Sequence, residues 1–192
     1  MDISSKRPLY CWIDIETSGL NPRLDHILEV AIVVTGPDLI ELTGLSMIVN
    51  PALGRHGQGW EDRMDDHVRR MHTSSGLLRE VIYAPSLAHV DEAMVAILKP
   101  LGAEKYICSG YRPSFDHAFV KEHMSGLASR VPDNFLDVIS MRRLIRDFAS
   151  RPDLIPELAD TGRAHRAMSD VQDAITEARI YSQYLSLIPK WA

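Results

Sequence analysis

The sequence predicts an α/β domain built on a mixed central sheet flanked by helices, and two observations predict it. Three strand-like runs, at 8–15, 26–35 and 39–49, open the chain and are separated by short turns. After them, strand-like runs alternate with helical patterns up to the last segment, a pattern typical of a mixed sheet covered by helices. Because no linker, repeat or low-complexity tract divides the 192 residues, we expect a single domain over 1–192.

Turn and cap signals define the elements of the first half. The first strand is followed by "TSGLNP", which is turn chemistry, and "GPD" predicts a hairpin between the second and third strands. The stretch "WEDRMDDHVRRMHTSSGLLREVIYA" predicts two short helices, broken near 73–76. The next segment, "PSLAHVDEAMVAILKPLG", predicts a helix capped by Ser86 and stopped by Pro100.

The second half alternates between strands and helices. A fourth strand is predicted at 104–110, and "SFDHAFVKEHM" predicts a helix capped by Ser114. The segment "NFLDVISMRRLIRDFA" predicts a short strand that runs into a helix. The last helix is predicted at about 168–187, because its apolar residues recur on one side.

Composition and charge limit the classes of function. A net charge of −5 disfavours a long, sequence-indifferent nucleic-acid groove, but not a short nucleic acid held through metal ions. The chain has no long uncharged apolar run, and its start, "MDISSKRPLY", lacks the apolar core of a signal peptide, so no membrane partner is expected. Cys11 and Cys108 lie in strand-like stretches, which indicates reduced, buried thiols of a cytoplasmic protein.

The stretch "WIDIETSGL" places Asp14 and Glu16 in a run that is otherwise apolar. Residues two apart in a strand share a face, so these two carboxylates point the same way and repel each other. A divalent metal is the usual remedy, since carboxylate oxygens are ligands for Mg²⁺ and Mn²⁺. The alternative is an edge strand with one face in water, which the core-like flanks and the poor strand propensity of Asp and Glu disfavour.

Three later residues are candidates to join this pair. Asp116 follows the fourth strand and Asp170 begins the last helix, although each alone is explained as an acidic residue favoured near a helix N-terminus. His165 precedes Asp170 by five positions, which on one continuous helix would set the two side chains about 140° apart. They can converge only if His165 lies on a loop before the helix, and "ADTGR" at 159–163 supports such a loop.

The joint pattern of "D-x-E-T-x-G-L", a later Asp and "H-x4-D" resembles the DEDDh family of 3′-to-5′ exonucleases. This resemblance implies a ribonuclease H-like fold and hydrolysis assisted by two divalent ions, Mg²⁺ or Mn²⁺. Carried over residue by residue, it makes Asp14, Glu16, Asp116 and Asp170 the metal ligands. It makes His165 the general base.

Within that family the chain is most similar to the oligoribonuclease branch, which cuts very short RNA. The stretches "MHTSSGLLREV", "FLDVISMRRL" and "AHRAMSDVQDAITEARIY" carry this similarity, which also implies a homodimer. Three residues match or replace substrate-binding positions of the branch. Leu20 matches an apolar wedge beside the terminal bases; the alternative is a core residue that anchors the turn. His72 would stack on a base, or it is only a helix-start residue. Thr17 stands where the branch has Met.

The chain departs from the branch around the expected dinucleotide cap. Asp133 and Asn134 stand where the branch has a Tyr-Arg pair, and Ile139 stands in place of a serine. Arg112 stands in place of a small polar residue, and its guanidinium suits the bidentate phosphate contact that the missing arginine would have made. The catalytic centre therefore matches the branch, whereas the cap that selects dinucleotides does not.

The sequence thus predicts a 3′-to-5′ exoribonuclease that hydrolyses short single-stranded oligoribonucleotides to mononucleotides. One alternative is a DEDDh exonuclease that acts on the ends of longer single-stranded RNA or DNA. The other is a nucleic-acid-binding module without activity, which should have lost one or more of the ligands; none is missing here.

Overall fold

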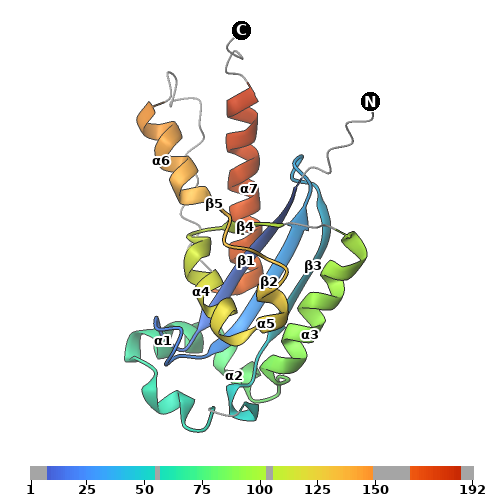
Figure 1. Cartoon of the computed structure of the whole chain (residues 1–192). Coiled ribbons are helices and arrows are strands. Elements are labelled where there is room, and N and C mark those ends of the chain that lie inside the picture. Colours follow the sequence, from blue (N-terminus) through green and yellow to red (C-terminus); the bar gives the residue numbers. More distant parts are fainter. Residues whose placement is uncertain (1–7, 55–56, 103–105, 149–164, 187–192) are drawn as a thin grey trace.

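The computed structural model describes residues 8–54, 57–102, 106–148 and 165–186 of the chain. In this part of the chain a five-stranded sheet has the order β3-β2-β1-β4-β5 (Figure 1). Its strands are β1 (Leu9–Thr17), β2 (Ile27–Thr35), β3 (Glu41–Ile48), β4 (Tyr106–Gly110) and β5 (Phe135–Asp137). The first three strands pair antiparallel, whereas β4 runs parallel to β1 and β5 parallel to β4. The predicted mixed sheet is confirmed.

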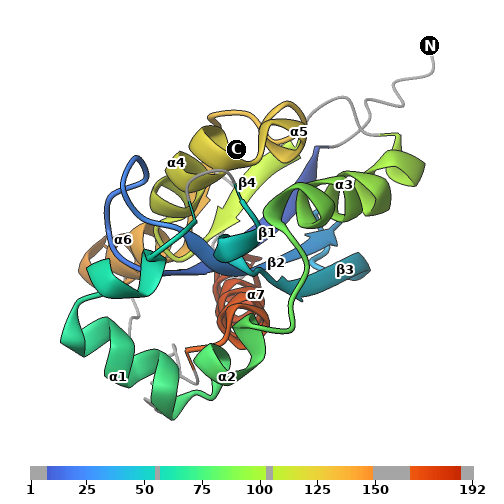
Figure 2. The ribbon, with the colours of Figure 1, turned by 90° about the horizontal axis from the view of Figure 1, so that it is seen from below.

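Helices cover both faces of this sheet. They are α1 (Asp66–Ser74), α2 (Leu77–Val81), α3 (Leu87–Leu98), α4 (Pro113–His123), α5 (Ser125–Ala128), α6 (Val138–Phe148) and α7 (Ala167–Ser186). Short 3₁₀ turns occur at Pro51–Leu53, Trp60–Arg63 and Lys99–Leu101. Figure 2 shows α3, α4 and α5 on one side of the sheet and α7 on the other. Among the described helices, none combines the length and the apolar character that a bilayer span requires.

The alternation of β1 divides the core into two layers. Ile13 and Ile15 pack on one face with buried residues of α3, α4 and α5, while Trp12 packs on the other face with α7. Asp14 and Glu16 follow Trp12 at intervals of two residues, so they lie on the α7 side. Cys11 and Cys108 are opposite each other on β1 and β4 as free, buried thiols.

Several predicted boundaries differ from those observed. Pro113, not a residue after Ser114, begins α4, and the residue before it, Arg112, has a left-handed backbone with φ 52°. Proline suits the first helical position because its missing N–H would have no partner there, so the predicted Ser114 cap is wrong. The short α5 was not expected. The break predicted near 73–76 is confirmed, since Gly76 has φ 82° between α1 and α2. The loop predicted at 159–163 and the end of the last helix at 187 lie outside the described residues.

Candidate active site

Three carboxylates from the two ends of the chain meet at one place. Asp14 and Glu16 come from β1, and Asp170 comes from the first turn of α7. One ligand oxygen from each lies within 4.8 Å of the others. Because α7 packs against β1 and β2, its first turn brings Asp170 to the face of the sheet that carries the β1 pair. The structure therefore brings these three predicted side chains together.

Asp116 reaches the same end of β1 from α4. Its Oδ1 accepts a hydrogen bond of 3.1 Å from the backbone N–H of Ile15, which lies between the two strand carboxylates. Strand β4 pairs with β1 only as far as Trp12, so Asp116 provides the partner that a strand would otherwise supply. Asp116 is 3% exposed and is therefore fixed beside the cluster.

Burial and mutual repulsion disfavour the ionised forms of these carboxylates. Burial raises the pKa of Glu16 to about 8, and repulsion from Asp170, Glu29 and Asp116 adds to this shift, while Arg166 opposes it. Burial also raises the pKa of Asp116 to about 8, again with a contribution from Asp170. Carboxylates gathered in this way are stabilised by a bound cation. Hard oxygen donors of this kind fit Mg²⁺ or Mn²⁺, so the residues suit the metals that the sequence predicts.

His165 lies two residues before α7 and is exposed. Its backbone has φ 48°, so it is outside the helix, as its convergence with Asp170 requires. Burial lowers the pKa of His72, while its hydrogen bond with the Thr17 backbone opposes this shift. Nδ1 of His72 lies 3.8 Å from Oε2 of Glu16.

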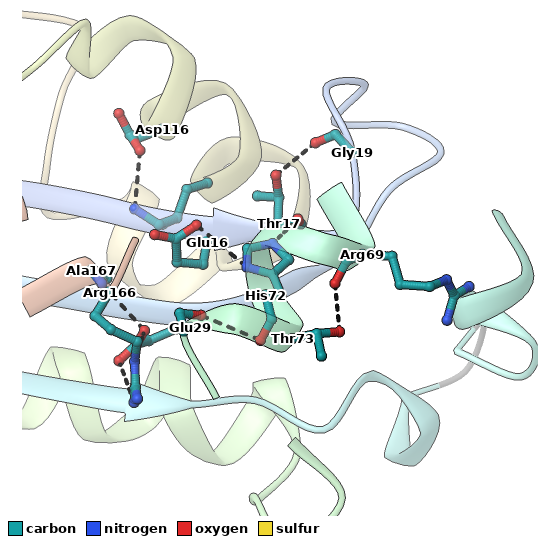
Figure 3. Close-up of polar contacts among 12 residues, drawn as sticks. Glu16, Thr17, Gly19, Glu29, Arg69, His72, Thr73, Asp116, Arg166 and Ala167 are labelled. Carbon is teal, nitrogen blue, oxygen red and sulfur yellow. Dashed lines mark hydrogen bonds and ion pairs between the residues drawn. The ribbon is translucent and has the colours of Figure 1, made fainter. Parts of the chain in front are cut away.

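His72 has a role that its sequence position did not indicate. Its ring is completely buried, and Nε2 lies 2.9 Å from the carbonyl oxygen of Thr17, to which it donates (Figure 3). A buried ring offers no face to a base, so the predicted stacking role is wrong, and His72 lies in the last turn of α1 rather than at a helix start. The hydroxyl of Thr17 donates to the carbonyl of Gly19 at 2.6 Å and so closes the turn after β1.

The remaining predicted substrate residues are on the surface. Leu20 is 79% exposed, which rules out the alternative that it anchors the turn as a core residue. Arg112 is exposed, and its backbone N–H donates to Asp137. Asp133 forms ion pairs with Lys121 and His117, at 3.1 and 3.0 Å. Asp133 stands where the oligoribonuclease branch has the tyrosine of its Tyr-Arg pair. In this chain that position therefore carries an acidic residue that forms ion pairs with neighbouring side chains.

Two residues at the site were missed by sequence reasoning. Glu29 on β2 is opposite Glu16 on β1, and Arg166 lies between His165 and α7. The sequence could have indicated Glu29, because it is the one charged residue in the strand "ILEVAIVVT", which is buried along its whole length. A carboxylate at such a position needs a partner, and Arg166 provides it at 3.0 Å.

Comparison with solved structures identifies the fold. The chain superposes on exonuclease I from Methylocaldum szegediense with a TM-score of 0.68 and 17% identity, over 94% of this chain and 41% of that one. It superposes on the zinc-bound complex of E. coli exonuclease I with single-stranded DNA with a TM-score of 0.67 and 18% identity, over 94% and 42% of the two chains. The protein thus has the ribonuclease H-like fold of the DEDDh exonucleases.

Sequence comparison is more specific. No family model matches the chain. The oligoribonuclease of Tropheryma whipplei is 34% identical over 178 residues, which are 90% of this chain and 91% of the relative. Those of Arabidopsis thaliana and Idiomarina loihiensis are 31% and 30% identical over 182 and 191 residues, which are 93% and 96% of this chain and 78% and 98% of the relatives. The chain belongs to the oligoribonuclease family.

Proposed function

We propose that the protein is a metal-dependent 3′-to-5′ exoribonuclease that hydrolyses short single-stranded oligoribonucleotides to mononucleotides. The observation that carries this proposal is the convergence of Asp14, Glu16 and Asp170 in a chain of the oligoribonuclease family. A binding module without activity would not need to keep these carboxylates together against their mutual repulsion.

The four carboxylates would hold two divalent ions, Mg²⁺ or Mn²⁺. Asp14 would be shared between the ions, Glu16 and Asp170 would hold one, and Asp116 would hold the other. When bound, such ions stabilise charge on the phosphate and the leaving oxygen and favour ionisation of the attacking water. The strand position of Asp14 and the hydrogen bond from Ile15 to Asp116 keep these ligands in place before substrate arrives.

His165 would take the proton from the attacking water. An imidazole is suited to this task near neutral pH, and the exposure of His165, two residues before α7, leaves it accessible to water and substrate. His165→Ala should therefore lower kcat by roughly 10²–10⁴-fold while binding of short RNA is kept. A variant that turns over at the wild-type rate would remove the general-base assignment.

One assay tests the proposed function. Purified protein with Mg²⁺ or Mn²⁺ is given a labelled diribonucleotide, a long single-stranded RNA and a single-stranded DNA, with Asp14→Asn as the inactive control. We expect rapid loss of the diribonucleotide with the wild type and no turnover with the variant. If the long strands are degraded and the diribonucleotide persists, the substrate class is wrong. If nothing is cleaved, the protein is a binding module.

Longer single strands are the second candidate substrate, and a separate cavity favours them. This cavity, of about 330 Å³, lies between the β1–β2 loop, the segment after β3 and the end of α4, and shares no residue with the carboxylate cluster. Arg23 and Arg63 line it, and neither forms an ion pair with a residue that the structure describes. If it binds upstream phosphates, Arg23→Ala with Arg63→Ala should slow cleavage of long RNA but not of a diribonucleotide.

We also propose that the protein is a cytoplasmic homodimer. Exposed apolar side chains of α6 and α7, namely Leu144, Phe148 and Leu185, support an interface on these helices, which lie side by side in Figure 1. Free thiols at Cys11 and Cys108 are consistent with a reducing compartment. Light scattering should give twice the chain mass, and Phe148→Asp should shift the protein towards monomer.

A further inference from the structure

Hydrogen-bond donors of the protein occupy all acceptor positions of the Glu29 carboxylate. Its Oε2 accepts from Nε of Arg166 at 3.0 Å and from the backbone N–H of Ala167 at 3.2 Å. Its Oε1 accepts from Nη2 of Arg166 and from the hydroxyl of Ser46, both at 3.3 Å. An ionised carboxylate has about four acceptor positions, so all of them are occupied by protein groups. Glu29 is therefore not free to act as a further metal ligand, although it is next to Glu16.

These contacts tie the turn that carries His165 to the sheet. Arg166 and Ala167 are the two residues that follow His165, and both bond to the same carboxylate of β2 (Figure 3). The side chain of Glu29 is only 4% exposed, so removing its partner would leave a buried charge. The bidentate geometry also fixes direction, because two parallel N–H···O bonds restrict the guanidinium to one orientation.

Arg166 has a second, outer partner in Glu80 at the surface of α2. Nη1 of Arg166 is 3.0 Å from Oε1 of Glu80 and Nη2 is 3.3 Å from Oε2, and the side chain of Glu80 is 49% exposed. Exposed ion pairs of this kind contribute little, because water screens them. The inner contact with Glu29 should therefore fix the turn, and Glu80 offers a matched control on the same arginine.

The backbone at His165 needs such support. A left-handed φ of 48° is unfavourable for a residue with a Cβ and persists only where the surroundings impose it. The residue that follows it is held by the bidentate pair, and the next one begins α7 with its N–H on Glu29. Loss of the contacts between Glu29 and the two residues after His165 would allow this backbone to relax and the imidazole to change its orientation.

We propose that Glu29 and Arg166 are positioning residues that hold His165 in the orientation that catalysis requires. This inference rests on the proposed function and assigns these two residues no contact with substrate or metal. A displacement of about 1 Å in a catalytic group can lower a rate by roughly 10²-fold, so loss of the contact between Glu29 and Arg166 should lower mainly kcat.

A double-mutant cycle separates positioning from general loss of structure. Glu29→Gln should lower kcat on a diribonucleotide roughly 10–10²-fold and change KM less than about 2-fold. In a His165→Ala background the same change should have almost no further effect, since Glu29 acts through that imidazole. An equal loss in both backgrounds would overturn the inference. Glu80→Gln, the control, should stay within about 2-fold of wild type.

Two readouts keep the test independent of activity. Mn²⁺ affinity, measured by calorimetry, should be unchanged in Glu29→Gln, whereas a large loss would make Glu29 a ligand and overturn the inference. The ring resonances of His165 in an NMR spectrum should shift in Glu29→Gln and not in Glu80→Gln, and no shift would also contradict it. Should Glu29→Gln fail to fold, Arg166→Lys, which keeps the charge but not the bidentate pair, takes its place with the same expectations. If Asp14→Asn proves as active as wild type, the proposed function fails instead.

Discussion

Charged residues inside apolar strands are the informative residues of this chain. Asp14 and Glu16 interrupt an apolar run, and this favoured a site that needs a cation over an edge strand with one face in water. The same argument applies to Glu29, whose strand is buried along its whole length, but its partner could not be inferred because Arg166 is far away in sequence. The burial of His72 was equally out of reach of the sequence, since it depends on how α1 packs against the turn at Thr17.

Arg112 combines an exposed cationic side chain with a strained backbone, which is common where a residue is kept for function. Arg112→Gly should stabilise the protein by roughly 1 kcal/mol, because glycine adopts φ 52° without steric cost. If the guanidinium binds a phosphate, KM for short RNA should rise about 10-fold in the same variant. Thermal unfolding and steady-state kinetics measure the two effects.

Arg112→Ala is the matched control for that variant. It removes the same guanidinium but keeps a Cβ at the left-handed position, so KM should rise equally while stability does not improve. An unchanged KM in both variants would show that Arg112 makes no phosphate contact.

At the scale of elements, periodicity predicted the strands and the longer helices but not their ends. The alternating pattern of β1 continues to Thr17, two residues beyond the predicted end, because its last polar residues belong to the site and not to a turn. The four-residue α5 is too short to show a helical period. The true start of α4 depends on the backbone of Arg112, which packing imposes and no local sequence signal announces.

Helices α6 and α7 are joined by a buried carboxylate, Glu177. Arg142 donates to both of its oxygens, Tyr111 donates to Oε2 at 2.7 Å, and the hydroxyl of Tyr181 donates to Oε1. Burial alone would raise the pKa of Glu177, but these donors outweigh it and lower the pKa below its usual value. Since Tyr111 directly follows β4, the same carboxylate supports the turn that leads to Asp116.

This network predicts an acid-sensitive contribution to stability. Folding lowers the pKa of Glu177, so the unfolded chain binds its proton more readily than the folded one. The contribution should be complete above pH ~4.3, the usual pKa of a glutamate, and should be lost as the pH falls through the folded-state pKa. Glu177→Gln should lower the free energy of unfolding at pH 7, measured by chemical denaturation. It should also reduce the loss of this free energy as the pH falls. A pH dependence of unfolding in acid identical to that of the wild type would contradict the assignment.

At the scale of the whole molecule, the candidate active site exists only because the sheet order brings distant segments together. Strand β1 is central, β4 leads into α4 beside it, and α7 returns across its other face. Spacing alone could place neither Asp116 nor Asp170 next to β1, and the resemblance to the DEDDh exonucleases was needed to join them. That resemblance did not indicate the contacts that support the site, which are made by His72 with Thr17 and by Glu29 with Arg166.

The central claim is that four carboxylates of this fold form one site for divalent cations. Calorimetric titration of the purified protein with Mn²⁺ tests it most directly, with Asp14→Asn in parallel and thermal unfolding to confirm that the variant is folded. We predict saturable uptake by the wild type, a rise in Tm on binding, and an affinity at least about 10-fold weaker in the variant. No uptake by the wild type, or equal affinity in Asp14→Asn, would contradict the account.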